Sequence, residues 1–409
     1  MSEQVIRLTS QLVSTPTEYA RLREQAPLVR VALPEMETQS WLITRYEDVE
    51  AALTDPRFIR DASKLPGHEG EPNIVDKMLE GYQLPKEYHN YFDALVLTDG
   101  EEHARKRGVI TRAFTANRLK ALRPRVEQIT HDLYQTLSAK GEADLIGEFT
   151  TPLAGAALCE LVGIEEADRP RIFEYFTFLQ GGDPTELVPK LTAFVDHLKG
   201  LIAQRRAEPA DDLLSTLVRL SDEEGDFDED DIIATLFQLI NTGIVPPSQF
   251  MADSILALLG HLDQVERLRA EPGLITTTAV PELLRFTTSV PLGATLYATE
   301  DLEFCGKQLK QGDAVTASLA AANYDPSRYS EPLKLDLTRQ LGRGVGHMTL
   351  GYGPHYCIGS GMARLIGEVV LEQLFIKHEG LSLAVARDEL KYQGVPGQGL
   401  YLLSLPVRF

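Results

Sequence analysis

One cysteine, Cys357, lies in the stretch Leu350-Gly-Tyr-Gly-Pro-His-Tyr-Cys-Ile-Gly359, where glycines surround a single thiol. Glycines let backbone N–H groups approach the sulfur closely, because no Cβ atom blocks the turn. The residues from Ser360 to Leu365 can continue as a helix, whose positive N-terminal end favours an ionised thiol. The spacing therefore predicts a thiolate held as a metal ligand. A buried cysteine in an ordinary tight turn would not need these glycines and a histidine.

A thiolate ligand pushes electron density into a haem iron and helps O–O bonds to break. The stretch around Cys357 resembles the haem-thiolate loop of the cytochrome P450 family. The resemblance implies that Cys357 ligates the iron of haem b (iron protoporphyrin IX) and that His355 binds a haem propionate. It implies further haem contacts from the same loop and the helix after it: Leu350, Gly351, Gly359 and Ala363.

Other landmarks of that family follow in the same order along the chain. Glu282 and Arg285 resemble its Glu-x-x-Arg pair, and their spacing places both charges on one helix face. By the same resemblance, Arg339 closes an ion-pair cluster with them. His103 and Arg107, one helical turn apart, resemble the pair that binds haem propionates. The resemblance runs from about residue 15 to the end of the chain.

The chain has 409 residues and no linker rich in Gly, Ser or Pro, so we expect a single cytochrome P450 domain over residues 1–409. Hydrophobic periodicity predicts a mainly α fold with small β-sheets. The helical segments are 118–140, 152–162, 169–179, 186–207, 230–262, 280–287 and 359–378. The strand segments are 28–32, 41–43, 295–298, 302–304, 314–319 and 399–405. The single haem would lie between the long helix from Asp230 and the helix after Cys357.

Composition excludes several classes of protein. A balance of 40 basic against 60 acidic residues disfavours binding to nucleic acid or to an acidic membrane surface. The chain has no run of eighteen apolar residues and no signal peptide, so we expect a cytoplasmic protein, and we expect a monomer. Three cysteines form no disulfide framework, and Cys159 reads as a packing residue on a buried helix.

Basic residues nevertheless gather in one region. In the P450 family this region lies on the side of the haem where acidic ferredoxins dock, so the resemblance implies a ferredoxin and a ferredoxin reductase as partners and NAD(P)H as an indirect electron source. Ordinary helix-surface charge explains about half of the group. The residues are Arg105, Lys106, Arg107, Arg112, Arg118, Lys120, Arg123, Arg125 and Arg364.

The central helix departs from the family. The family places an acid and an alcohol over the haem, where they relay protons, next to a glycine that corresponds to Gly243. Thr242 precedes that glycine, but the acid position holds Val245 and the alcohol position holds Pro246. Valine carries no proton, and proline has neither a hydroxyl nor an N–H group. We therefore expect these four positions of the catalytic segment to work without the usual side-chain relay.

Two adjacent prolines also remove helix hydrogen bonds. Pro246 and Pro247 cannot donate to the carbonyls of Thr242 and Gly243, so we expect a kink or widened turn between residues 241 and 248. Water, a substrate donor or the side chain of Ser248 would then pair with the freed carbonyls. A second departure follows, because Leu296 stands where the family has a propionate-binding arginine. A third is Leu350 in place of phenylalanine.

The resemblance also places the substrate pocket. Its predicted walls are mostly apolar, with two amides to orient a ligand. The candidate substrate-binding residues are Phe237, Asn241, Ile244, Val290, Leu292, Ala294 and Gln398.

Together these features predict a haem-thiolate oxidoreductase that acts on a bulky secondary metabolite, aromatic or derived from a peptide. The reaction is either hydroxylation or an oxidative C–C, C–O or C–N coupling or ring closure, because the missing relay favours chemistry that stops at hydrogen abstraction. The alternative from another class is a non-catalytic haem-binding or partner-docking protein. The Cys357 loop and the pair of His103 and Arg107 argue against that alternative.

Overall fold

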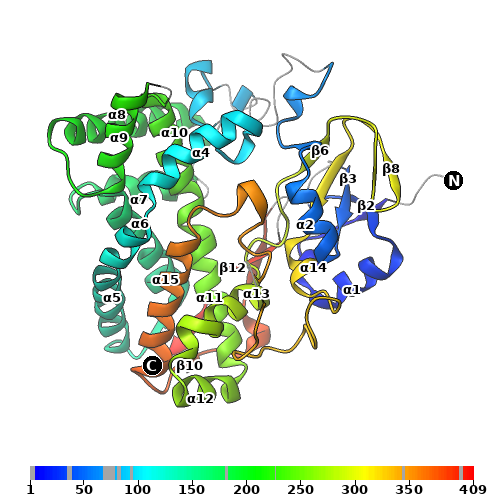
Figure 1. Ribbon diagram of the computed structural model, residues 1–409. Helices are drawn as coiled ribbons and strands as arrows, with labels where there is room; N and C mark the ends of the chain where they lie inside the picture. Colours follow the sequence, from blue (N-terminus) through cyan, green and yellow to red (C-terminus); the bar gives the residue numbers. More distant parts are fainter. Residues whose placement is uncertain are drawn as a thin grey trace. The chain divides into compact units, whose positions relative to one another are not determined.

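A computed structural model describes residues 5–34, 39–67, 79–80, 84–92, 95–179, 183–225, 227–342, 346–395 and 399–409. Residue contacts divide the chain into two compact units. The first contains residues 1–60, 130–151 and 246–409, and the second contains residues 61–129 and 152–245. The helical and sheet elements of both units are drawn in Figure 1. The predicted class, mainly α with small sheets, is confirmed, whereas the single domain stays a prediction.

The largest sheet belongs to the first unit and has six strands in the order β1-β2-β3-β9-β6-β4. Its strands are β1 (Ile6–Arg7), β2 (Leu28–Ala32), β3 (Gln39–Ile43), β4 (Phe58–Ile59), β6 (Leu296–Ala298) and β9 (Ala314–Ala317). β3 pairs in parallel with β9, with Trp41 opposite Val315. The sequence thus places a strand from the beginning of the chain beside one that lies more than 270 residues later.

Three helices of this unit carry apolar residues toward the sheet: α1 (Pro16–Gln25), α2 (Tyr46–Thr54) and α14 (Leu319–Asn323). The core cluster joins Tyr46, Val49 and Ala52 of α2 to strand residues such as Ile43 and Val315, and Met348 is part of it. Since these side chains are almost completely buried, they anchor α2 next to the segment that leads to Cys357.

Smaller sheets complete the first unit. A three-stranded sheet has the order β10-β13-β5, and two hairpins are β7-β8 and β11-β12. The strands are β5 (Glu142–Asp144), β7 (Leu302–Phe304), β8 (Lys307–Leu309), β10 (Ser382–Leu383), β11 (Tyr392–Gly394), β12 (Leu400–Leu402) and β13 (Pro406–Arg408). The side chain of Gln249 accepts from and donates to the backbone of Leu402, at 3.0 Å each, and thereby ties the β11–β12 hairpin to a helix.

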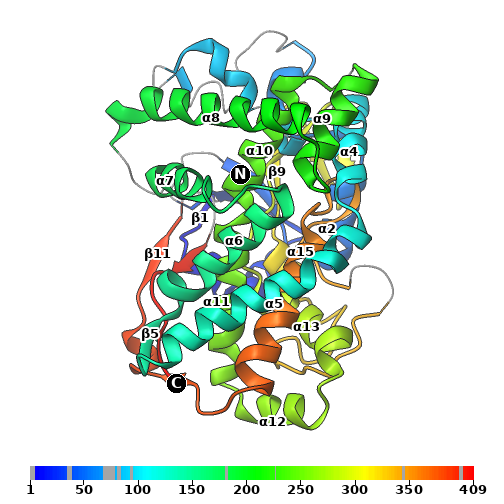
Figure 2. The same ribbon diagram turned by 90° about the vertical axis from the view of Figure 1, so that its left-hand side faces the viewer.

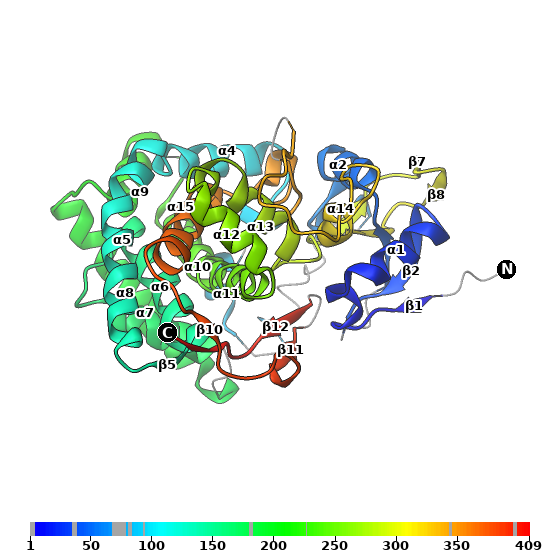
Figure 3. The same cartoon turned by 90° about the horizontal axis from the view of Figure 1, so that it is seen from below.

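The remaining helices of the first unit lie side by side in Figures 2 and 3. They are α11 (Val245–Leu259), whose first residue belongs to the second unit, α12 (Leu262–Ala270), α13 (Val280–Thr287) and α15 (Ser360–Leu371). A glycine allows their close packing, because a Cβ atom at Gly367 of α15 would lie 3.0 Å from the ring of Phe250 on α11. This helix layer supports α15, the helix that follows Cys357.

The second unit is helical. Its helices are α4 (Gly100–Ala113), α6 (Thr151–Val162), α7 (Arg169–Leu179), α8 (Leu187–Ala207), α9 (Leu213–Glu224) and α10 (Glu229–Gly243), while α5 (Ala116–Ser138) runs through the boundary between the units. An acidic stretch precedes α10 and forms the start of that helix. Gly225 ends α9 with a φ of 70°, and Asp228 and Asp231 form a capping box on α10.

Candidate active site

The loop that carries Cys357 is closed by its own backbone. The N–H group of Cys357 donates to the carbonyl of Leu350 at 2.8 Å, and that of Gly351 donates to the carbonyl of Met348 at 2.8 Å. Gly351 and Gly353 have φ values of 74° and 69°, a region that other residues adopt only with strain. The glycines are therefore required by the turn itself, as the sequence predicted.

Gly353 also permits a close approach to α2. A Cβ atom at this position would lie 2.8 Å from Cγ2 of Thr54 and 3.0 Å from the carbonyl oxygen of Leu53. No real side chain tolerates the first of these distances, so the loop can rest on the end of α2 only because residue 353 is glycine. A residue near the start of the chain thus fixes one side of the Cys357 loop.

The thiol of Cys357 stands in an open environment. Its side chain is only partly buried, and a Cβ atom at Gly359 would lie 3.8 Å from the sulfur. α15 begins at Ser360 with Gly359 as its N-cap, which points the positive end of the helix toward the loop. Cys159 lies in a different environment: its side chain is 1% exposed on α6, and burial raises the pKa of its thiol to about 11. The packing role predicted for Cys159 is confirmed.

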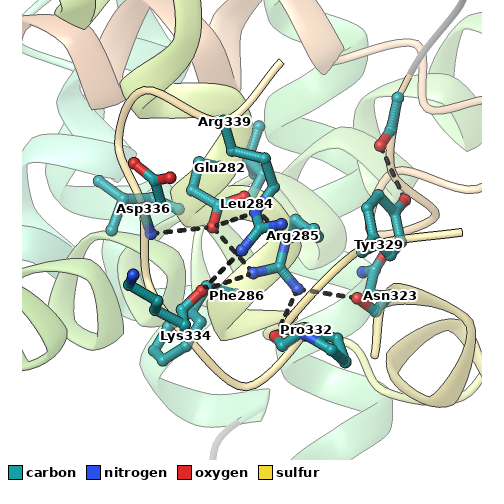
Figure 4. Close-up of polar contacts among 12 residues, drawn as sticks. Glu282, Leu284, Arg285, Phe286, Asn323, Tyr329, Pro332, Lys334, Asp336 and Arg339 are labelled. Carbon is teal, nitrogen blue, oxygen red and sulfur yellow. Dashed lines mark hydrogen bonds and ion pairs between the residues drawn. The ribbon is translucent and has the colours of Figure 1, made fainter. Parts of the chain in front are cut away.

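The predicted ion-pair cluster forms in the first unit and is drawn in Figure 4. Arg285 donates from Nε and Nη2 to the two carboxylate oxygens of Glu282, at 2.7 and 2.8 Å, and both side chains are completely buried. Arg339 donates from Nε to the same carboxylate at 3.0 Å, so its predicted place in the cluster is confirmed. Oε2 of Glu282 thus accepts from Arg285 alone, and Oε1 accepts from Arg285, from Arg339 and from the N–H group of Asp336, which together offset the cost of burying the charge.

The cluster is connected to the Cys357 loop through one asparagine. Arg285 donates to the backbone carbonyl of Asn323 at 2.8 Å. The Asn323 side chain accepts from the N–H group of Met348 at 2.7 Å and donates to the hydroxyl of Thr349 at 2.8 Å. Residue 349 directly precedes the loop. The sequence alone does not indicate this role for Asn323, because its partners lie about 25 residues later in the chain.

Tyr329 and His347 complete the support of this segment. The Tyr329 hydroxyl donates to the carbonyl of Gly346 at 2.8 Å, as Figure 4 shows. His347 is fully buried, and neither of its ring nitrogens has a hydrogen-bond partner in the described part of the chain. Burial, together with the charges of Arg364 and Arg285, lowers the pKa of His347 to about 3. The ring is therefore neutral at physiological pH.

The central helix is broken, as predicted from the two prolines. α10 ends at Gly243, α11 begins at Val245, and Ile244 between them has a φ of −112°. The structure therefore confirms the interruption between residues 241 and 248. Val245 and Pro246 occupy the first two positions of α11, where a helix loses nothing by lacking an N–H group.

The prediction that Ser248 pairs with the freed carbonyls is wrong. Its hydroxyl lies 2.8 Å from the hydroxyls of both Thr150 and Thr151, so it is used in a buried cluster of hydroxyl groups. The sequence could not show this, because the two threonines are almost a hundred residues away. Thr242 bonds within its own helix, with its hydroxyl donating to the carbonyl of Gln238 at 2.7 Å.

Side chains on α10 fall into two groups. Asn241 and Thr242 are exposed, although the helix around them is buried from Ile232 to Ile240 and again at Ile244. Phe237 is 1% exposed and packs among the rings of other aromatic residues of the second unit. Those rings are Tyr91, Phe92, Tyr175 and Phe194. For Phe237, Asn241 and Ile244, a role in a substrate wall stays a prediction.

The residues after α13 include three more predicted wall positions. Val290 and Ala294 are partly buried, whereas Leu292 is 1% exposed and packs with Val13 and Leu42 in a core cluster. Leu296 lies in β6 and is buried in the core of the large sheet, so this position holds an apolar packing residue. Gln398 lies outside the described residues.

His103 and Arg107 occupy successive turns of α4 in the second unit. The imidazole of His103 is almost completely buried at 3% exposure, whereas Arg107 is partly buried. Their relation to Cys357 in the other unit stays a prediction.

The predicted basic surface carries less free charge than expected. Lys106 pairs with Asp231 at 3.0 Å, and Arg112 pairs with Glu224. Arg118, Arg123 and Arg125 also pair with carboxylates. In the described part of the chain, Arg105 and Lys120 are exposed and make no ion pair. Intramolecular carboxylates thus pair with five of the nine residues, and docking of an acidic ferredoxin in this region stays a prediction.

The residues around Cys357 fit a haem. The Cys357 side chain is only partly buried, backbone hydrogen bonds close its loop, and α15 directs its positive end at the site. Within the described residues, no group of three or more His, Cys, Asp or Glu side chains could hold a metal by itself, so a single thiolate is the candidate ligand.

The fold and this loop define a haem-thiolate oxidoreductase, and comparisons with known proteins agree. The family model described as Cytochrome P450 matches residues 155–381. The chain is 34% identical over 393 residues to cytochrome P450 107B1 of Saccharopolyspora erythraea, covering 95% of this chain and 94% of that protein. It is 33% identical to mycinamicin IV hydroxylase/epoxidase of Micromonospora griseorubida, covering 95% of this chain and 94% of that protein.

A solved structure is similar over the whole length. The cytochrome P450 enzyme CxnD, for C–S bond formation in chuangxinmycin biosynthesis, has a TM-score of 0.81 and 29% identity, covering 100% of this chain and 98% of that chain. The chain belongs to the cytochrome P450 family. It is therefore a monooxygenase or oxidase whose cofactor is haem and whose electrons come from NAD(P)H through redox partners. No helix among the described residues is long and apolar enough to cross a membrane.

Proposed function

We propose that this cytochrome P450 oxidises a bulky secondary metabolite, and that it does so without a side-chain acid and alcohol on its central helix. Mycinamicin IV hydroxylase/epoxidase supports the substrate class, since it is similar over nearly the whole chain. The observation that carries the proposal is the break at Ile244, with Val245 and Pro246 at the start of α11. Haem, when bound at Cys357, supplies the dioxygen-dependent oxidation.

The chain's own residues divide the remaining work. The glycines of the Cys357 loop hold the thiol open toward its ligand, and Asn323 fixes the segment before the loop. Asn241 and Thr242 present polar groups on an otherwise buried helix, where an amide can orient a substrate. Val245 can only exclude water and contact apolar groups, because its side chain holds no proton.

We propose hydroxylation as the main reaction and oxidative bond formation as the second candidate. Hydroxylation consumes two electrons and two protons and places one oxygen atom of O2 in the product. Bond formation within the substrate removes two hydrogen atoms and adds no oxygen. Both reactions need two electrons and two protons to reduce dioxygen, and bond formation releases both oxygen atoms as water, so the missing side chains at Val245 and Pro246 bear on proton delivery in either reaction. CxnD, which is similar to this chain, is named for C–S bond formation, and this supports bond formation as the second candidate.

Electrons are proposed to arrive from a ferredoxin and its reductase. Arg105, Lys120 and Arg364 are exposed and make no ion pair in the described part of the basic group, so they are the proposed contacts for an acidic partner.

The test is turnover in labelled dioxygen. The holoenzyme, a ferredoxin, its reductase and NADPH would be incubated under 18O2 with candidate macrolides and aromatic peptides, and products analysed by mass spectrometry. One labelled oxygen per product indicates hydroxylation, and loss of two hydrogens without label indicates bond formation. If NADPH oxidation yields only peroxide with every member of both classes, the proposed substrate class is wrong.

A further inference from the structure

The first unit contains a cavity of about 390 Å³ away from the Cys357 loop. It is bounded by the segment before α1, by α11, by the end of α13 and by the β11–β12 hairpin. Its volume lies within the range of small-molecule sites in proteins. The Cys357 loop contributes nothing to its walls.

This cavity is separate from the predicted substrate walls. Between residues 289 and 294, Ser289 and Pro291 line the cavity, whereas Val290, Leu292 and Ala294 do not. None of these three predicted wall residues lines the cavity, although Leu292 packs with Val13, which does line it.

A carboxylate in the wall has no partner. Asp253 lies on α11 and forms neither a hydrogen bond nor an ion pair in the described part of the chain. Burial raises the pKa of this carboxyl group to about 7, because the ionised form loses contact with water. By exposure Asp253 is partly buried, so its carboxylate borders the cavity and is not sealed in the core, and leaving it unpaired there costs free energy. An unpaired carboxylate in a cavity wall is a feature that a cationic ligand would satisfy.

The rest of the wall suits an organic cation. Tyr19, Phe286, Tyr324 and Tyr392 all line the cavity, and the face of an aromatic ring attracts a positive charge. Ser289 is nine-tenths buried, and its hydroxyl has no hydrogen-bond partner among the described residues. The wall thus offers a carboxylate, a hydroxyl and several rings, which together match an ammonium group on an apolar body.

We propose that this cavity binds an organic ammonium ion, with the positive group at Asp253 and the apolar part against the aromatic rings. The one cation in the wall, Arg387, does not pair with Asp253 in the described structure. Its side chain is exposed, so water and salt screen its charge from the cavity. The site does not depend on the proposed substrate of the enzyme, because none of the described residues of the predicted substrate walls lines the cavity.

The direct test is calorimetric titration of the holoenzyme with benzyltrimethylammonium. This probe carries a permanent charge and has no lone pair to ligate a haem iron. At pH 8 we expect saturable binding, and Asp253→Asn should weaken it at least about tenfold. Asp263→Asn, on α12 and outside the cavity, should leave it unchanged. Phenylacetate, with the same ring and the opposite charge, should not bind.

The pH dependence of binding provides a second test. Because benzyltrimethylammonium has no titratable group, any change of its affinity with pH comes from a group of the protein. Tyr324, Tyr392 and Tyr401 are the titratable groups coupled to Asp253, and burial raises the pKa of each above its ordinary value. The guanidinium of Arg387 keeps its charge. Between pH 8 and pH 6 the wild-type Kd should therefore rise about tenfold through protonation of Asp253, and the Asp253→Asn Kd should stay constant.

Two results would overturn the proposal. One is equal affinity of the probe for the wild type and for Asp253→Asn, with both variants showing the same thermal midpoint and the same spectrum of the haem. The other is binding of phenylacetate as tight as that of the cation. Comparing Tyr392→Phe with Tyr392→Ala adds a check on the rings, because only the alanine variant should lose affinity.

Discussion

Replacing Arg285 by alanine should destabilise the protein more than any surface substitution. The guanidinium makes two bonds to Glu282, at 2.7 and 2.8 Å, and donates to the carbonyls of Asn323 and Pro332 at 2.8 and 2.9 Å. Removing one partner of a buried ion pair costs about 3–5 kcal/mol, and each buried carbonyl left without a donor adds about 1–3 kcal/mol.

Arg339 keeps its bond to Glu282 at 3.0 Å in this variant and offsets part of the loss. We therefore expect a decrease of about 5 kcal/mol in the free energy of unfolding, a large share of the roughly 5–15 kcal/mol that holds a typical domain together. Because Asn323 also fixes Met348 and Thr349, haem content should fall together with stability.

The assay is urea unfolding followed by circular dichroism and by the haem absorbance. Arg219→Ala is the matched control, since Arg219 pairs with Glu223 across one turn of α9 at 2.7 Å and both side chains are more than half exposed. That change should cost less than about 0.5 kcal/mol. The double variant Glu282→Gln with Arg285→Met should be more stable than Arg285→Ala, because neither of the two completely buried side chains is then charged and Arg339 keeps its bonds to backbone carbonyls. A loss below about 2 kcal/mol for Arg285→Ala, with an unchanged denaturant slope, would refute the reasoning.

Three further predictions concern the site. Cys357→His should abolish the red-shifted Soret band of the reduced carbon monoxide complex while some haem stays bound, and a histidine-like spectrum in the wild type would contradict the ligand. The double change Val245→Asp and Pro246→Thr should alter the ratio of peroxide released to product formed, and an unchanged ratio in a folded variant means that protons arrive by another route. In the folded protein the pKa of His347 is lowered to about 3, so its ring is neutral. As the pH falls below about 6.5, the unfolded chain therefore binds a proton at this residue and the folded protein does not. Stability should therefore decline from about pH 6.5 downward, and His347→Phe should reduce that decline in urea unfolding at pH 7 and pH 5.

Local patterns predicted much of the fold. Periodicity gave β2, β7, α7 and α13 with the bounds that the structure has. The two prolines predicted the break between α10 and α11, since a missing N–H group acts on its own helix. Such features depend on residues within one turn or one strand.

Contacts between distant residues could not be predicted in the same way. Ser248 was expected to serve its own helix, but two threonines at positions 150 and 151 compete for its hydroxyl. The basic residues of α4 and α5 read as a free patch until the structure placed Glu224 beside Arg112. Asp253 gave no signal at all, because a single acid in a helix is usually solvated. Its unpaired state depends on walls drawn from five separate segments.

The contact between Gly353 and α2 has a consequence for how the enzyme is made. About 300 residues separate Thr54 from Gly353, and ribosomes add roughly 5–20 residues per second. The end of α2 is therefore synthesised roughly 15–60 s before the loop that rests on it. Until residues such as Val315 and Met348 have been synthesised, Tyr46, Val49 and Ala52 lack these packing partners.

A nascent chain in this condition exposes apolar surface and invites association with chaperones or with other chains. The thiolate loop can close only after residues 350–359 have been synthesised, so haem is captured after the strands of the large sheet have been made. Cells that overproduce this enzyme should then accumulate haem-free chains whenever translation outpaces folding, and slower translation should raise the fraction of loaded enzyme.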